Sequence, residues 1–101
     1  MTNHLTITDR ETALKQTLAG VSPNQTVINV TLPGDRESTL FNRHDNYTNK
    51  PGGWVHFAAR VDSRVVVPMS AIVDAGATVV VDGRLADGQY VAPNEVVVAL
   101  Q

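Results

Sequence analysis

Three side chains could form a metal or acid–base site: the adjacent residues His44 and Asp45, and His56. Imidazole and carboxylate groups are common zinc ligands, and a zinc site needs three or four ligands at one point. The first two residues lie in an irregular stretch and His56 in a predicted strand, so nothing in their spacing brings them together. We therefore interpret them as polar loop and strand residues, and we expect no metal ion and no other cofactor.

Candidate nucleophiles lack the surroundings that catalysis requires. None of Ser38, Ser63 and Ser70 stands in a Gly-x-Ser-x-Gly turn between a strand and a helix. The pair Gly52-Gly53 does not belong to a phosphate-binding glycine pattern, and the chain contains no cysteine. We therefore expect that the protein is not an enzyme.

Basic and aromatic residues are interleaved in the middle of the chain. Single-stranded nucleic acid is bound by basic groups, which neutralise phosphates, beside aromatic rings, on which bases stack. Between positions 35 and 64, however, five basic residues face four acidic ones, a net charge of only +1. Nucleic-acid binding is therefore the alternative hypothesis, and its candidate contacts are Arg43, Lys50, Arg60 and Arg64.

The same region contains candidate anchors for a protein partner. If residues 54–62 form a regular strand, Trp54, His56 and Arg60 point to one side of it. Aromatic and arginine side chains are the preferred anchors of protein interfaces. Phe41 and Tyr47 are further candidates from the polar stretch before this strand. The alternative for Trp54 is that it packs under the N-terminal helix and completes the core.

The N-terminal half of the chain predicts one helix, one strand and a long loop. Thr8 and Glu11 match a capping box, and Gly20 can end the helix, so we predict a helix over 9–19 within an N-terminal helical segment, 1–22. Alternation of apolar residues predicts a strand over 27–32. Residues 33–53 show no clear period and are expected to form a polar loop outside the sheet that contacts another chain.

Residues 54–101 are expected to form a β-rich core. The stretch SRVVVPMSAIVDAGATVVVDGRL, residues 63–85, predicts a strand ended by Pro68, one or two helical turns over 69–75, and a second strand over 77–86. Asp87-Gly88 is typical of a hairpin turn, and no internal repeat is predicted. The residues expected inside are Val55, Phe57, Val61, Val79, Val81, Val96 and Val98.

These elements predict one domain over 1–101 of the α+β class, mainly β. We expect a small, mostly antiparallel sandwich or barrel with one N-terminal helix. The stretch GATVVVDGRLADGQYVAPNEVVVALQ is similar to the late strands of bacterial single-stranded DNA-binding proteins, which implies an oligonucleotide-binding barrel. Residues 63–83 also look like the swapped-hairpin transcription factors of the AbrB type, which implies an intertwined DNA-binding dimer. The two resemblances imply different folds for the same residues, so neither is adopted.

Composition favours a protein that associates with other proteins. Hydrophobic residues make up 43% of the 101 residues, which is a globular composition, whereas charged residues make up only 18% and the net charge is −2. There is no signal-peptide pattern at the start and no apolar run long enough to span a membrane. We expect cytoplasmic synthesis and a structural or interaction subunit in a homo-oligomer or larger assembly, such as a capsid-decorating or tail protein of a phage virion.

Overall fold

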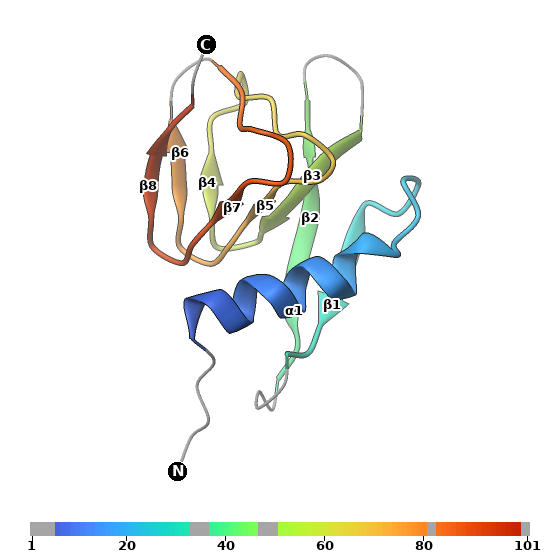
Figure 1. Ribbon diagram of the computed structural model, residues 1–101. Coiled ribbons are helices and arrows are strands. Elements are labelled where there is room, and N and C mark those ends of the chain that lie inside the picture. The colour runs from blue at the N-terminus through green and yellow to red at the C-terminus, as the bar shows by residue number, and fades with distance from the viewer. Residues whose placement is uncertain (1–5, 33–36, 47–50, 81–82, 100–101) are drawn as a thin grey trace.

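The computed structural model describes residues 6–32, 37–46, 51–80 and 83–99. Within these residues one helix lies across one side of a body of short strands (Figure 1). No helix in the described part of the chain has the length and hydropathy needed to cross a membrane. The elements are α1 (Ile7–Ala19), β1 (Val27–Val30), β2 (Thr39–Asp45), β3 (Pro51–His56), β4 (Arg60–Val61), β5 (Ile72–Val73), β6 (Thr78–Val80), β7 (Tyr90–Val91) and β8 (Val96–Val98).

The predicted N-terminal helix is confirmed, and it begins two residues earlier than expected. Thr6 rather than Thr8 is the N-cap, and its side chain accepts a hydrogen bond of 3.0 Å from the backbone N–H of Asp9. The cap satisfies one of the N–H groups that the first helical turn leaves without a partner. Leu14 and Leu18 form the buried side of the helix, as the apolar stripe predicted.

From β3 onward the chain winds as a solenoid with a constant period. Trp54 pairs with Ile72 and Ile72 with Tyr90, while on the next side Arg60 pairs with Thr78 and Thr78 with Val96. A bridge between Val66 and Arg84 marks the third side. Every one of these parallel partners is separated by 18 residues. Each turn therefore consists of three sides of six residues.

A six-residue repeat of aliphatic side chains fills the interior of the solenoid. On each side an inward residue directly follows the first paired residue, and two-residue turns make the corners among the described residues. Gly76, Gly88 and Asn94 occupy corners with φ values of 71°, 73° and 64°, a conformation that glycine and asparagine tolerate best. The repeat, which the sequence analysis did not predict, consists of Val55, Val61, Val67, Val73, Val79, Leu85, Val91 and Val97.

The strands form two sheets. The larger has the order β1-β2-β3-β5-β7, in which β1, β2 and β3 are antiparallel and the remaining pairs are parallel. The smaller, β4-β6-β8, is wholly parallel. The expectation that 33–53 lies outside the sheet is wrong for residues 39–45 and 51–53, which pair as β2 and the start of β3. Backbone pairing with Val27–Val30 and with β3 gives these polar residues their partners.

The larger sheet separates two apolar cores. On its inner side lies the solenoid interior, which includes Val73, Val79 and Val91. On its outer side α1 packs on the sheet, and the second core consists of Leu14, Leu18, Val30, Leu32, Phe41, Trp54 and Ile72.

The α+β, mainly β, class is confirmed, but the antiparallel arrangement does not extend beyond β3. Four of the six strand pairs are parallel, and no closed barrel is formed by the described strands. Residues 69–75 contain turns and β5 instead of helical turns, because the six-residue period requires a corner at 69–70 and a strand at 72–73. Asp87-Gly88 forms such a corner and not an antiparallel hairpin. The pairing also differs from both folds that the family resemblances imply.

Part of the predicted interior points outward. Val79 is buried and Val55 and Val61 are partly buried, as expected. Phe57, Val96 and Val98 are 64%, 71% and 58% exposed. Phe57 stands at a corner, where strand alternation stops, and inward Val97 places both of its neighbours on the outer side. Val81, the remaining residue of the prediction, lies outside the described part of the chain.

Candidate interaction surface

The outer side of β4-β6-β8 is an uncovered sheet surface, which we call the open face. The inward position of Val61, Val79 and Val97 requires the flanking residues on each strand to point outward. The exposure of Val96 and Val98 shows that no described segment covers this part of the sheet. The open face consists of Arg60, Thr78 and Val96 in one column and of Val80 and Val98 in the next. Asp62, which directly follows β4 and donates its N–H to the oxygen of Val79 at 3.0 Å, continues this second column.

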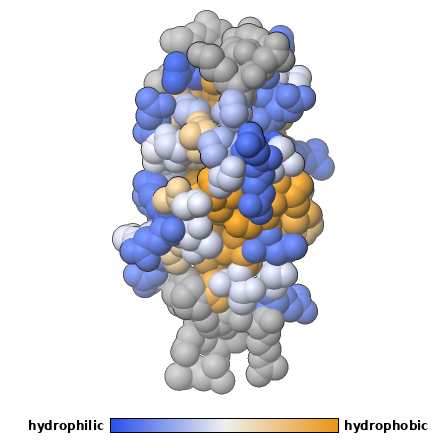
Figure 2. Space-filling model, turned by 90° about the vertical axis from the view of Figure 1, so that its right-hand side faces the viewer, coloured by the Kyte–Doolittle hydropathy of each residue, from blue (hydrophilic) through white to orange (hydrophobic). Residues whose placement is uncertain are grey.

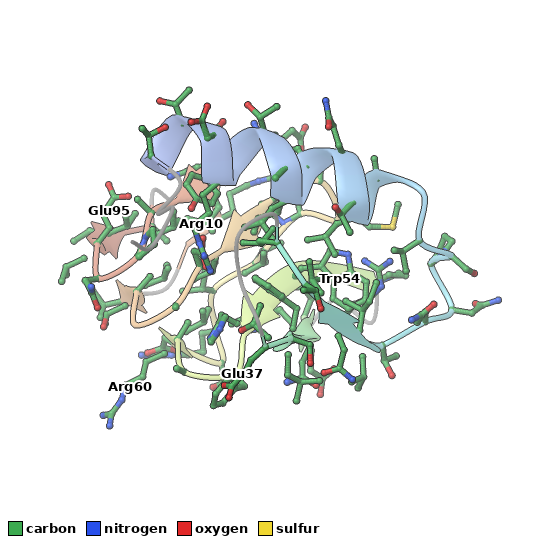
Figure 3. All side chains as sticks on the ribbon, turned by 90° about the horizontal axis from the view of Figure 1, so that it is seen from below. Arg10, Glu37, Trp54, Arg60 and Glu95 are labelled. Carbon is green, nitrogen blue, oxygen red and sulfur yellow. The ribbon has the colours of Figure 1, made fainter. Side chains whose placement is uncertain are left out.

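The open face is charged at one edge and apolar at the other. Arg60 is exposed and extends away from the molecule on the side opposite α1 (Figure 3). Asp62 accepts hydrogen bonds from the backbone N–H of Arg64 at 2.9 Å and from its side chain. These hydrogen bonds lower the pKa of Asp62, so the carboxylate is negatively charged at neutral pH. The edge strand β8, by contrast, presents only valines.

A second apolar surface lies at the end of the solenoid where the first turn begins. Figure 2, which views the side at the right of Figure 1, shows apolar surface bordered by polar residues. Val55, Ala59 and Val61 of the first turn are only partly buried, whereas the equivalent residues of the next turn, Val73, Ala77 and Val79, are at most 1% exposed. The interior is therefore less completely covered at this end than in its middle.

Most of the predicted protein anchors lie in the core beneath α1. Phe41 is fully buried and Trp54 is 2% exposed, so neither is available on the surface of the chain. The alternative proposed for Trp54, that it packs under the helix, is the arrangement observed (Figure 3). Of the predicted anchors only Arg60 is exposed, and Tyr47 lies outside the described residues.

His56 is also buried, and its hydrogen bonds define its protonation state. Its Nδ1 accepts a hydrogen bond of 3.0 Å from the backbone N–H of Ala58, so the proton of the neutral ring is on Nε2. Nε2 donates to the hydroxyl of Thr39. Burial lowers the pKa of His56, nearby Arg10 lowers it further, and Asp74 opposes this effect. His56 is therefore a neutral structural residue at neutral pH.

The three residues considered for a metal site do not converge. Phe41 pairs with His56 across β2 and β3, so these two share one side of the sheet, whereas alternation puts His44 on the other side. His44 donates from Nε2 to the backbone oxygen of Val65 at 2.8 Å. Among the residues that the structure describes, no three His, Asp or Glu side chains are placed to hold a metal ion.

The predicted nucleic-acid contacts are not gathered on one surface. Arg43 lies over the Trp54 ring at 4.2 Å and donates hydrogen bonds to the backbone oxygens of Ser22, Gln25 and Gly52. These contacts hold the segment after α1 against the sheet and leave Arg43 poorly placed to bind phosphate. Arg60 and Arg64 are exposed and Arg64 is bound to Asp62, while Lys50 lies outside the described residues.

Arg43 and Trp54 also border a groove of about 400 Å³ at the end of α1. Leu18, Met69 and Ile72 contribute apolar surface to it, and Lys15 lies at its rim. Lys15 forms an ion pair with Glu11, and Arg43 is held by backbone oxygens. The groove therefore offers apolar contact but no converging polar groups that would orient a ligand.

A buried ionic cluster, which the sequence analysis missed, joins α1 to the solenoid. Arg10 donates two hydrogen bonds, of 2.6 and 2.9 Å, to the fully buried carboxylate of Asp74. The hydroxyl of Tyr90 donates to the same carboxylate at 2.5 Å, and the backbone N–H of Ala75 donates at 2.7 Å. Burial raises the pKa of Asp74, but these hydrogen bonds outweigh that effect and the pKa is lowered.

The cluster positions the helix and offers no catalytic arrangement. Burial and the contact with Asp74 raise the pKa of Tyr90 well above its usual value, so the phenol keeps its proton. Asp74 is already occupied by four hydrogen bonds from three residues. The 64-residue separation of Arg10 and Asp74 gave no local sequence signal, and only the 18-residue alignment of Ile72 with Tyr90 could have placed Tyr90 beside β5.

No family model, curated protein or solved structure matches this chain. The structural class is therefore stated from the geometry alone: a parallel β-solenoid with six-residue sides, extended by an antiparallel hairpin and covered on one side by a helix.

Proposed function

We propose that the protein is a non-enzymatic structural and interaction subunit of a larger protein assembly. The observation that supports this function best is the exposure of Val96 and Val98 on a regular strand of the open face. Exposed apolar residues gathered on one surface and bordered by polar ones are characteristic of protein contact sites. The open face combines these valines with Thr78 and Val80 in one sheet.

The rest of the molecule is consistent with this role. Helix α1 covers the outer side of the larger sheet, so that Trp54 and Ile72 are buried within the chain. No segment within the described ranges gives the valines of the smaller sheet a corresponding cover. A flat sheet surface of fixed spacing gives a partner a rigid, preformed contact, which reduces the entropy lost on binding. A virion component, such as a capsid-decorating or tail protein of a phage, is the type of subunit that we propose.

The proposal is tested by replacing the two exposed valines with threonine. The V96T/V98T variant retains β-branched side chains but exchanges one methyl group for a hydroxyl at each position. V27T is a matched control, because Val27 is an exposed valine on β1 of the other sheet. Native mass is measured after mild purification from the cells that make the protein or from particles that contain it. We expect wild type and V27T, but not V96T/V98T, to be recovered in a complex larger than one chain.

Two results would contradict the proposal. One is recovery of all three proteins as free chains. The other is salt-sensitive binding of the wild type to single-stranded DNA that is lost when Arg60 and Arg64 are both replaced by alanine, which would favour nucleic-acid binding instead.

A further inference from the structure

The open face carries opposite charges in its two columns. In the first turn of the solenoid Arg60 stands in one column and Asp62 in the other, and in the third turn Val96 and Val98 occupy the same two columns. Arg60 has no ion-pair partner among the residues that the structure describes. The charged pair and the valine pair are separated by the turn that contributes Thr78 and Val80.

A two-fold axis that lies in this face can run along the strands or across them. An axis along the strands would exchange the first turn with the third and place charged Arg60 against Val96 of the other copy. An axis across the strands keeps each turn opposite its own equivalent and exchanges the columns. Arg60 then faces Asp62 of the other copy twice, and Val96 faces Val98 twice.

We propose that the open face binds a second copy of this chain in the second of these arrangements. Arg60 and Asp62 have opposite charges, with Asp62 still bound to Arg64 of its own copy, and the valines meet valines. The face therefore matches itself under one symmetry operation, as a closed dimer requires. The strands of the two faces run antiparallel, with the sheets stacked about 10 Å apart. This inference rests on the proposed function and names the second copy as the partner.

The size of the face predicts the strength of the dimer. Three strands about 4.8 Å apart, each with three residues of about 3.3 Å, give a face of roughly 150 Å² per copy. A standard stable interface buries about 800 Å² per partner. We therefore expect a weak dimer that dissociates on dilution, formed at about 1 mM protein and absent at about 1 µM.

The first test is sedimentation equilibrium of the purified full chain over this concentration range. R60E places two carboxylates opposite each other at both charged contacts, so we expect dimerisation at least about 10-fold weaker than in wild type. K15E makes the same change in net charge on α1, away from the open face, and should dimerise as wild type does. Equal melting temperatures of R60E and wild type would exclude unfolding as the cause.

The second test examines the register. Because the chain has no cysteine, V96C and V98C each introduce a single thiol. In the proposed dimer residue 96 faces residue 98 of the other copy across about 10 Å, which a short bifunctional maleimide spans and a disulfide does not. A 1:1 mixture treated with this reagent should therefore form cross-linked dimers of one V96C and one V98C chain. Either variant alone should cross-link more slowly.

Three outcomes would overturn the dimer: a monomeric wild type at about 1 mM, equal dimerisation of R60E and wild type, or equal cross-linking in the mixture and in the single variants. These outcomes are distinct from failure of the proposed function. A purified chain that remains monomeric, while its larger complex still depends on Val96 and Val98, rejects the second copy and retains the proposed function. A purified chain that remains monomeric, and whose larger complex does not depend on Val96 and Val98, rejects both the dimer and the proposed function.

Discussion

The fully buried carboxylate of Asp74 connects two parts of the molecule that are distant in sequence. A buried charge is tolerated only when it is paired and hydrogen-bonded, and here Arg10, Tyr90 and the backbone of Ala75 supply those bonds. Arg10 belongs to α1 and Asp74 follows β5, so their contact holds the helix on the sheet.

We expect Arg10→Ala to lower the free energy of unfolding by about 2–4 kcal/mol, because it leaves the buried Asp74 without its cationic partner. Lys15→Ala is the matched control on the same helix: its ion pair with Glu11 is exposed and should contribute less than about 0.5 kcal/mol. Urea denaturation followed by Trp54 fluorescence measures both values. Similar losses in the two variants would show that the Arg10–Asp74 contact does not stabilise the helix on the sheet.

The buried neutral state of His56 should make stability depend on pH. Its pKa is lowered in the folded protein, so the unfolded chain binds more protons at mildly acidic pH. Stability is then fully present above the unfolded pKa of about 6.5 and is lost as the pH falls toward the folded pKa. Melting temperature should therefore decrease as the pH falls below about 6.5, and His56→Gln should reduce this dependence. An equal dependence in the variant would assign the effect to other groups.

At the scale of the elements, Gly53 of β3 closely approaches the third side of the first turn. A Cβ atom at this position would lie 2.2 Å from the backbone oxygen of Ala71 and 2.4 Å from that of Pro68. The N–H of Gly53 donates to the oxygen of Val67 at 3.0 Å. A glycine is therefore required here because the backbone of β3 lies directly against that of residues 67–71.

Gly53→Ala should destabilise the fold by roughly 2 kcal/mol or more, because backbone atoms of Pro68 and Ala71 must move. Gly20→Ala provides the comparison: no atom lies within 4 Å of its Cβ position, and its φ of −91° suits alanine. Gly20→Ala should leave the melting temperature nearly unchanged. Equal melting temperatures for the two variants would contradict the close approach described for Gly53.

The elements differ in how far the sequence could predict them. The helix and β1 were predicted because caps and alternation act between residues close in sequence. β2 was missed because its residues Asn42, Arg43, His44 and Asp45 show no apolar alternation, and their pairing comes from distant strands. The short strands after Trp54 were assigned an antiparallel order because a two-residue alternation, interrupted by a corner every six residues, resembles ordinary hairpins.

At the scale of the whole molecule, the frequency of valine made the solenoid difficult to predict from the sequence. Valine occupies both inward positions such as Val79 and outward ones such as Val96 and Val98, so hydrophobicity alone does not tell the two sides apart. The period of six was nevertheless present as an unbroken series of Val or Leu from Val55 to Val97.

The candidate site was predicted in part. Arg60 was expected to be exposed and lies on the open face. Val96 and Val98, which support the proposed function, were assigned to the interior instead. Which outward residues become neighbours depends on the 18-residue pairing between turns, and that pairing is a property of the complete fold.

The constant spacing of the turns also gives the gene a natural unit of length. Eighteen codons encode one turn, so duplicating or deleting such a block within the coiled region preserves the orientation of every later side chain. Each block changes the height of the molecule by about 4.8 Å, the distance between neighbouring strands. A shift of one codon within a strand instead exchanges inward and outward residues up to the next corner. Descendants of this gene that keep Asp74, the partner of Arg10 on α1, could therefore become longer or shorter in whole turns.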